Sequence, residues 1–205
     1  MLKLKIHEIE DSVEWDSFLL DQNQASLFQS YNWGLLQKNL GYSVFRYGFY
    51  TENKLIGSAQ TILVKAKRGT FLHVRHGPVI DKTLIQETQV WEQVIAHLVR
   101  QACKYKAWFI RISPLLPENT LPFFRQFGFH SAPIHRMDGE VCWVLDLNTT
   151  TEEILRNMRK TTRNLIKNAE KNGVEVFESE KIEILVDLMN KTARRQGFVM
   201  HEGIE

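Results

Sequence analysis

One segment constrains the fold of this chain more than any other, and it runs from Cys142 to Gly173: CWVLDLNTTTEEILRNMRKTTRNLIKNAEKNG. Apolar and polar residues alternate from Cys142 to Leu147, which predicts a strand with one buried face. Thr150 precedes Glu153 by three residues in a capping-box pattern, so a helix is expected to start within two residues of Thr150. Gly173 predicts the end of that helix, because glycine adopts the left-handed backbone of a C′ position at little cost.

The helix expected after Thr150 should have two different faces. Its apolar side chains recur at helical spacing and are expected to be buried: Ile154, Leu155, Met158, Leu165, Ile166 and Ala169. A basic ridge follows another side and comprises Arg156, Arg159, Lys160, Arg163, Lys167 and Lys171. Between Arg156 and Lys171 the single acid is Glu170, although exposed helix faces usually mix signs because like charges repel at i,i+4. The spacing alone leaves two readings open, a solvated surface and a face that binds an anion.

The remaining elements follow from periodicity and turn residues. Strands are expected at Leu2–Ile9, Phe45–Tyr50, Leu55–Val64, Phe71–Val74, Trp108–Ile112 and Val174–Phe177. A first helix, capped by Ser12, is expected to run through Trp15 and Leu19. Further helices are expected over Gln29–Leu40, Lys82–Lys106, Leu121–Phe127 and Lys181–Arg195. This order predicts a mixed α/β fold. No Arg/Gln-x-x-Gly-x-Gly/Ala turn precedes Lys82, which argues against a coenzyme A donor held at that helix start.

Several motifs stand in a fixed order along the chain: Phe28–Gly34 (FQSYNWG), Gly57–Gln60 (GSAQ), Arg75–Val79 (RHGPV), Phe109–Pro114 (FIRISP), Trp143–Leu147 (WVLDL) and the MRKTTR run from Met158. This set resembles the FemABX family, whose members are aminoacyltransferases that build peptidoglycan interpeptide bridges. The resemblance implies a GNAT-like acyltransferase domain, with a mixed, largely antiparallel sheet flanked by helices, in residues 1–147. Residues 148–205 would then be the N-terminal part of a second, incomplete GNAT-like domain.

The resemblance also implies substrate-binding residues. Lys38 lies where the family places a lysine that contacts the diphosphate of a UDP-linked precursor, and a compact charge suits phosphate oxygens. Arg75 and Gly77 belong to a segment similar to the family's Arg-Gly-Pro, with His76 intervening. Arg195 is similar to the arginine that joins the lysine on the diphosphate, although the neighbouring Arg194 is an alternative match. Without the resemblance, Lys38 would be read as a solvated lysine and the RHGPV segment as a tight turn.

The activity implied by the resemblance is transfer of an amino acid from aminoacyl-tRNA to the stem peptide of a UDP- or lipid-linked muropeptide. The anion-binding residues for the tRNA would be Arg156, Arg159, Lys160, Arg163 and Lys167. A lipid-linked acceptor leaves room for peripheral membrane contact. No catalytic group can be identified from the sequence. Ser113 stands at a position where many family members have an acidic residue. Positioning alone can supply much of the rate, because the donor ester is already activated. Two alternatives stay open: a GNAT-like N-acyltransferase with another donor, and a non-catalytic module that binds RNA or another anion.

Composition narrows the remaining choices. A net charge of +2 over 205 residues gives no overall signature of polyanion binding, so a nucleic-acid role must rest on a local patch. The apolar runs are too short for a membrane span and no signal peptide is recognisable, so a cytoplasmic location is expected. Cys103 and Cys142 lack metal-ligand spacing, and His73 with His76 is not a convincing ligand pair. Neither a metal nor a cofactor is therefore expected.

Overall fold

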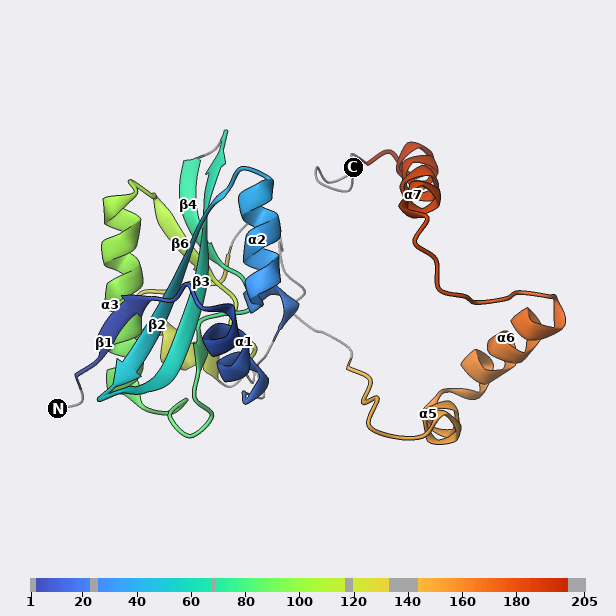
Figure 1. Cartoon of the computed structure of the whole chain (residues 1–205), viewed down its shortest axis with the longest axis horizontal. Coiled ribbons are helices and arrows are strands. Elements are labelled where there is room, and N and C mark those ends of the chain that lie inside the picture. Colours follow the sequence, from blue (N-terminus) through green and yellow to red (C-terminus); the bar gives the residue numbers. More distant parts are fainter. Residues whose placement is uncertain (1–2, 23–25, 68, 117–119, 133–143, 199–205) are drawn as a thin grey trace. The chain divides into compact units, whose positions relative to one another are not determined.

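The computed structural model describes residues 3–22, 26–67, 69–116, 120–132 and 144–198. The chain divides into an N-terminal unit, Met1–Glu140, and a C-terminal unit, Val141–Glu205, and each is described by itself (Figure 1). The domain boundary expected between residues 147 and 148 stays a prediction.

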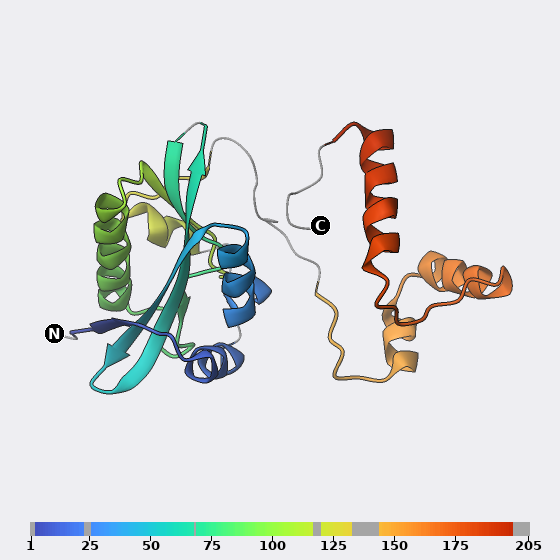
Figure 2. The same ribbon diagram turned by 45° about the horizontal axis from the view of Figure 1, so that its top comes forward.

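The N-terminal unit is built on a sheet with the strand order β1-β2-β3-β4-β6, in which β5 pairs with β3. The strands are β1 (Lys5–Glu8), β2 (Ser43–Thr51), β3 (Lys54–Ala66), β4 (Gly69–Val74), β5 (Val79–Ile80) and β6 (Phe109–Ile112). All pairs are antiparallel except β4 and β6, which run parallel. Figure 2 shows the long β2–β3–β4 meander that forms the centre of this sheet. The expected mixed, largely antiparallel sheet is confirmed.

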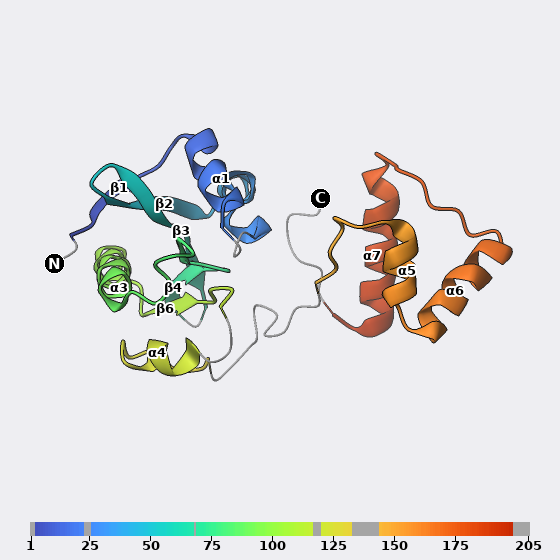
Figure 3. The same ribbon diagram turned by 90° about the horizontal axis from the view of Figure 1, so that it is seen from below.

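Helices cover both faces of the sheet (Figures 1 and 3). They are α1 (Ser12–Leu20), the 3-10 turn η1 (Leu27–Gln29), α2 (Tyr31–Asn39), α3 (Thr88–Lys104) and α4 (Leu121–Arg125). Helices α1 and α2 lie on one face, and α3 and α4 lie on the other. Since α3 connects the parallel strands β4 and β6, it is the crossover that parallel pairing requires.

Each face of the sheet has its own core. On the α3 face, the side chains of Trp91, Val94 and Leu98 are fully buried against the sheet residues Phe49 and Ile56. On the opposite face, the buried residues are Ile9, Trp15, Phe18, Leu19 and Val79. The sheet is therefore sandwiched between two layers of apolar side chains.

The crossover helix differs from the expectation at its start. It begins at Thr88 rather than Lys82, because the Asp81 carboxylate accepts hydrogen bonds from the Thr83 amide (2.9 Å) and hydroxyl (2.7 Å) and holds the segment in turns. The apolar spacing of this helix predicts Val99 on its core side, but Val99 is 46% exposed.

Two helix starts near the N-terminus also differ. Asp11, not Ser12, caps α1, since its carboxylate accepts from the amides of residues 13 and 14. The helix expected over Gln29–Leu40 is divided at Ser30, which has an extended backbone and whose hydroxyl accepts from the Trp33 amide at 3.2 Å. A serine cap thus separates η1 from α2.

The C-terminal unit contains α5 (Thr151–Asn157), α6 (Lys160–Lys171) and α7 (Ile182–Gln196). The expected helix start is confirmed, because Thr150 caps α5 by accepting from the Glu153 amide at 3.2 Å. Gly173 has a φ of +76° beyond the end of α6, as expected of a C′ glycine. The single helix expected between them is wrong: Met158, with ψ of 155°, breaks it into α5 and α6.

Two strands expected in this unit are absent from the described residues. Residues 144–147 and 174–177 have no strand partner, while Cys142 and Trp143 lie outside the described residues. The expected burial of one helix face is also wrong: α5 and α6 contain no buried residue, and Leu165 is 64% exposed. None of the helices in the described ranges is both long enough and apolar enough to cross a membrane.

Candidate functional site

The parallel strands β4 and β6 end together, and the residues that follow them form a candidate site. Val74 and Ile112 are the last paired residues. Immediately beyond them, the amide of His76 donates a hydrogen bond to the Ser113 hydroxyl at 3.0 Å. Ligands of open α/β sheets commonly bind outside the carboxyl ends of adjacent parallel strands. The turn at residues 75–77 therefore lies where this fold offers a binding edge.

An aromatic and polar cluster surrounds this turn. The Arg75 guanidinium lies 3.4 Å from the centroid of the Phe28 ring. The same ring meets the His76 imidazole edge to face at 4.8 Å. On the η1 side, the Ser26 hydroxyl lies 2.7 Å from His76 Nδ1. His76 itself has a left-handed backbone, with φ of +51°, which is uncommon for a residue with a side chain.

Two buried glutamines tie this cluster to the sheet. The side-chain amide of Gln29 donates to the Arg75 carbonyl at 2.7 Å and accepts from the Gln60 amide at 2.9 Å. Gln60 in turn donates from its side chain to the carbonyls of Phe28 (3.2 Å) and Ser30 (3.0 Å). Because buried amides are costly to leave unpaired, these bonds hold the η1 segment at a defined place.

Gly77 is explained by the same glutamines. A Cβ atom at this position would lie 2.7 Å from Gln29 Nε2, so any larger residue would push the Gln29 side chain out of its hydrogen bonds. The structural reason for Gly77 is therefore a close approach to Gln29, whatever further role it has toward a ligand.

Lys38 lines a different hollow, of about 360 Å³. Its lining residues are Glu8, Ile9, Glu10, Tyr31, Lys38, Val44, Phe45 and Arg46. Arg46 is only 5% exposed; it donates to Gln60 Oε1 (2.9 Å) and to the Tyr31 carbonyl (2.8 Å). Burial lowers the pKa of the Arg46 guanidinium, against the opposing effect of Tyr31 and Asp16. The hollow thus combines two cationic side chains with two carboxylates.

Neither Arg75 nor Gly77 is among the described residues that line the hollow beside Lys38. The two regions are instead connected through Gln60, whose side chain contacts both Arg46 and the Phe28 carbonyl. Whether Lys38, Arg75 and Gly77 contact one substrate stays a prediction.

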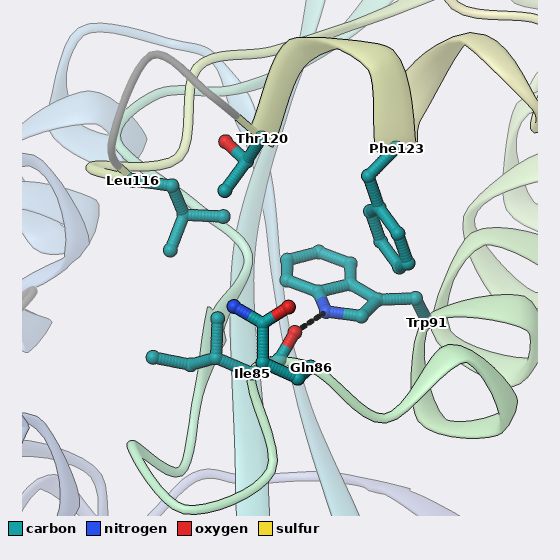
Figure 4. Close-up of a pocket in the computed structure, with 6 residues that line it drawn as sticks. All are labelled: Ile85, Gln86, Trp91, Leu116, Thr120 and Phe123. Carbon is teal, nitrogen blue, oxygen red and sulfur yellow. Dashed lines mark hydrogen bonds between the residues drawn. The ribbon is translucent and has the colours of Figure 1, made fainter.

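A second, smaller hollow of about 90 Å³ lies between the start of α3 and α4 (Figure 4). Its lining residues are Ile85, Gln86, Trp91, Leu116, Thr120 and Phe123. The Trp91 indole N–H points at the Ile85 carbonyl and donates to it at 2.9 Å. This space has room for a few water molecules at most, and its lining has no titratable side chain. We regard it as a packing gap. The described residues also contain no group of three or more His, Cys, Asp or Glu side chains that could hold a metal ion.

The basic ridge lies on the surface of the C-terminal unit. Arg156, Arg159, Lys160 and Lys167 are exposed. Arg163 is turned inward: its Nη1 donates to the carbonyls of Arg156 (3.1 Å) and Met158, at the C-terminal end of α5. A guanidinium suits that position because it satisfies carbonyls that lack helical partners. Arg163 therefore stabilises the α5–α6 junction, which leaves less of its side chain for a ligand.

Arg195 is exposed in the last turn of α7, next to Arg194. Since it belongs to the C-terminal unit and Lys38 to the N-terminal unit, the pairing of the two on one diphosphate stays a prediction.

A family model described as the FemAB family matches residues 11–131 and 124–203, which is most of the chain. The chain belongs to the FemAB family. The assignment made from the ordered motifs is thereby confirmed. Among solved structures, this FemAB-family chain is similar to one titled "Crystal structure of FemX", with a TM-score of 0.74 and 18% sequence identity. That alignment covers 98% of this chain and 54% of the FemX chain, so this chain spans about half the length of FemX.

A second similar structure is glucosamine-6-phosphate N-acetyltransferase from Arabidopsis thaliana, with a TM-score of 0.50 and 14% identity. It covers 68% of this chain and 99% of its own. At this identity the likeness shows the fold alone, and it confirms the expected GNAT-like α/β architecture. No curated protein matches the chain.

Sequence reasoning missed the polar residues that build the site of this FemAB-family chain. Gln29 and Gln60 stand inside the FQSYNWG and GSAQ motifs, yet nothing in their local spacing shows that their side chains meet. Ser26 and Arg46 lie outside those motifs altogether. Only their hydrogen bonds reveal them, because these bonds join residues 14 to 50 positions apart.

Proposed function

We propose that this chain is part of an aminoacyltransferase that moves an amino acid from aminoacyl-tRNA to the stem peptide of a UDP- or lipid-linked peptidoglycan precursor. The observation that carries the proposal is the FemAB family match over both units. A role with charged tRNA would place the protein in the cytoplasm, and a lipid-linked acceptor would bring it to the membrane surface.

The hollow beside Lys38 supports the acceptor side of this proposal. A nucleotide-linked muropeptide carries a diphosphate, and the exposed Lys38 ammonium faces the same space as the Arg46 guanidinium. Lysine binds phosphate oxygens as a point charge, whereas arginine presents a fixed set of donors. Arg46 already uses Nε and Nη2 within the protein, so Lys38 is the freer of the two cations.

Two features support a tRNA-borne donor. In α6, Lys160, Lys167 and Lys171 recur at spacings that place them on one exposed helix face, as a phosphate-contacting surface requires. At the start of α3, the N-cap residue is Glu87, whose carboxylate disfavours a second anion at that helix end. This is the helix start at which a coenzyme A pyrophosphate would be expected.

The experiment that tests the proposal is incubation of the full-length protein with charged tRNA and a UDP-muropeptide, followed by mass spectrometry of the stem peptide. An added amino-acid residue is the expected result. Transfer from acyl-coenzyme A but not from charged tRNA would favour the other acyltransferase class. Binding of tRNA with no product from either donor would favour the non-catalytic module.

The binding roles are tested separately. Lys38→Ala should weaken UDP-muropeptide affinity by roughly 10- to 100-fold, the loss of one charged hydrogen bond. Lys65→Ala, at an exposed lysine of β3, is the matched control and should leave the affinity unchanged. If the two variants bind alike, Lys38 is a solvated lysine.

For the donor, Lys167→Ala should lower the slope of log affinity for tRNA against log salt by about 1. Lys167 is a better test than Arg163, because loss of Arg163 would also remove its bonds to the end of α5. An unchanged slope would mean that the ridge is a solvated surface.

A further inference from the structure

Ser26 and His76 are fifty residues apart in the chain, yet their side chains meet with 2.7 Å between the Ser26 hydroxyl oxygen and His76 Nδ1. The contact stands at the carboxyl ends of β4 and β6, where the fold offers a binding edge. His76 is held there by its amide bond to the Ser113 hydroxyl and by the edge of the Phe28 ring. The pair is thus fixed from three segments of the chain.

The Ser26 hydroxyl has the right bonding for proton transfer. Its oxygen accepts from the Phe28 amide at 3.3 Å, which leaves the hydroxyl proton available for His76 Nδ1. A hydroxyl that donates to an imidazole is the arrangement with which enzymes pass protons during acyl transfer. The Ser26 side chain is partly exposed, whereas the imidazole is nearly buried, so Ser26 is the member of the pair that a substrate can reach.

The backbone at His76 also indicates a function. A non-glycine residue with φ of +51° costs about 1 kcal/mol or more, and such residues cluster at functional sites. The neighbouring polar groups cannot replace the imidazole as a proton acceptor: Gln29 and Gln60 carry neutral amides, and the guanidinium of Arg75, over the Phe28 ring, has no acceptor atom. Among these groups, the His76 imidazole is the one whose ring nitrogens can both accept and donate a proton.

We propose that Ser26 and His76 form the proton relay of the aminoacyl transfer, an inference that rests on the proposed function. As the acceptor amine attacks the donor ester, the new C–N bond forms and an amine proton passes to the Ser26 oxygen. The Ser26 proton moves in the same step to His76 Nδ1. When the C–O bond to the ribose breaks, the proton returns by this route to the ribose oxygen. The acceptor's ammonium group loses its other proton to solvent before the amine attacks. The relay therefore ends unchanged.

The kinetic test compares the full-length wild-type protein with Ser26→Ala and His76→Gln across neutral and alkaline pH. Both variants should lose about 10²- to 10⁴-fold in kcat, with little change in KM for the muropeptide. Their deficit should shrink as pH rises, because the deprotonated amine and hydroxide replace the relay. A merely structural role predicts a loss that is equal at every pH. Ser30→Ala removes a cap hydroxyl from the same segment and should keep the wild-type pH profile.

A measurement without substrate tests the pair itself. Nitrogen-15 NMR of the His76 imidazole should show Nδ1 without a proton and Nε2 with one, and Ser26→Ala should change the Nδ1 shift. A protonated Nδ1 would overturn the relay, as would wild-type kcat in either variant. If the wild-type protein transfers nothing from charged tRNA, the proposed function fails and the relay with it. If it transfers normally and both variants do too, only the relay is wrong.

Discussion

The two units of this chain contain amphipathic helices of similar length but bury them very differently. In the N-terminal unit, α3 has seven buried residues, among them Trp91, Val94 and Leu98 with no exposed surface. In the C-terminal unit, the one buried residue that α7 contributes is Ala193, while Leu185 and Leu188 of the same helix are each more than half exposed. The same sequence pattern thus leads to a core in one unit and to an open apolar face in the other.

The difference shows that periodicity specifies a helix but not its packing partner. Helices shorter than about 12–15 residues are marginal in water, and most of their stability comes from tertiary packing. Helix α5 has 7 residues and α6 has 12, so their local contacts carry more weight than those of α3. These contacts include the Thr150 cap and the Arg163 bonds to the end of α5.

The largest expected effect compares one leucine from each unit. Leu98→Ala should lower the free energy of unfolding by about 2–5 kcal/mol, because it opens a cavity in a closed core. Leu188→Ala, at a side chain that is 55% exposed, should cost less than about 0.5 kcal/mol. Urea unfolding of both variants measures the contrast. A loss above about 2 kcal/mol for Leu188→Ala would break the comparison, since that face would then be buried in solution.

Most elements of the N-terminal unit could be predicted because they have a local signal, whereas the two-residue strand β5 and the 3-10 turn η1 were not expected. Strand alternation located β2 and β3 to within a few residues, and apolar spacing located the body of α3. The two strand errors in the C-terminal unit have a common cause. Residues 144–147 and 174–177 alternate like strands, yet a strand forms only where a neighbouring strand accepts its hydrogen bonds. The break at Met158 could not be predicted either, because no proline or glycine stands there as a signal for the end of a helix.

The candidate site was less predictable than the fold. Lys38, Arg75 and Gly77 were found through the family resemblance, and the structure gives Gly77 a reason that spacing could not: the nearby side chain of Gln29. The Ser26–His76 contact depends on the position of η1 against the end of β4, which no local pattern encodes. Long-range polar contacts of this kind require the tertiary structure.

A second prediction uses the pH dependence of the N-terminal core. His97 is 8% exposed, and burial, with a smaller effect from Arg100, lowers its pKa from 6.5 to about 4. Between these values the unfolded chain binds a proton that the folded chain does not. The neutral His97 therefore contributes its full stabilisation above pH 6.5. As the pH decreases to 4, this contribution to the free energy of unfolding falls by about 3 kcal/mol.

Urea titrations at several pH values measure this loss. His97→Phe is the control, because phenylalanine keeps a ring against Tyr47 and His97 Nε2 has no hydrogen-bond partner among the described residues. This variant should lose less stability between pH 6.5 and 4 than the wild-type protein does. Equal losses in both proteins would show that other groups govern the acid sensitivity.

A third prediction concerns how α2 is attached to the sheet. Gly34 is the buried residue of α2, and a Cβ atom there would collide with the side chains of Gln60 and Arg46. Gly34→Ala should therefore destabilise the N-terminal unit by roughly 1–3 kcal/mol. Helix propensity alone predicts the opposite sign, a gain of about 1 kcal/mol. The direction in which the urea midpoint of Gly34→Ala changes decides between these two predictions. A higher midpoint would mean that α2 packs loosely enough against the sheet to accommodate the added methyl group.

The smallest expected effect tests whether α5 depends on its cap. Thr150→Ala removes the acceptor for the Glu153 amide and should cost about 1 kcal/mol, seen as faster amide exchange in α5. Thr150→Ser keeps the hydroxyl and is the matched control, so its exchange should stay close to wild type. Because no residue of α5 is buried, the loss should stay local and leave exchange in α3 unchanged. If exchange in α3 rises as well, the two units unfold together and α5 owes its stability to packing rather than to its cap.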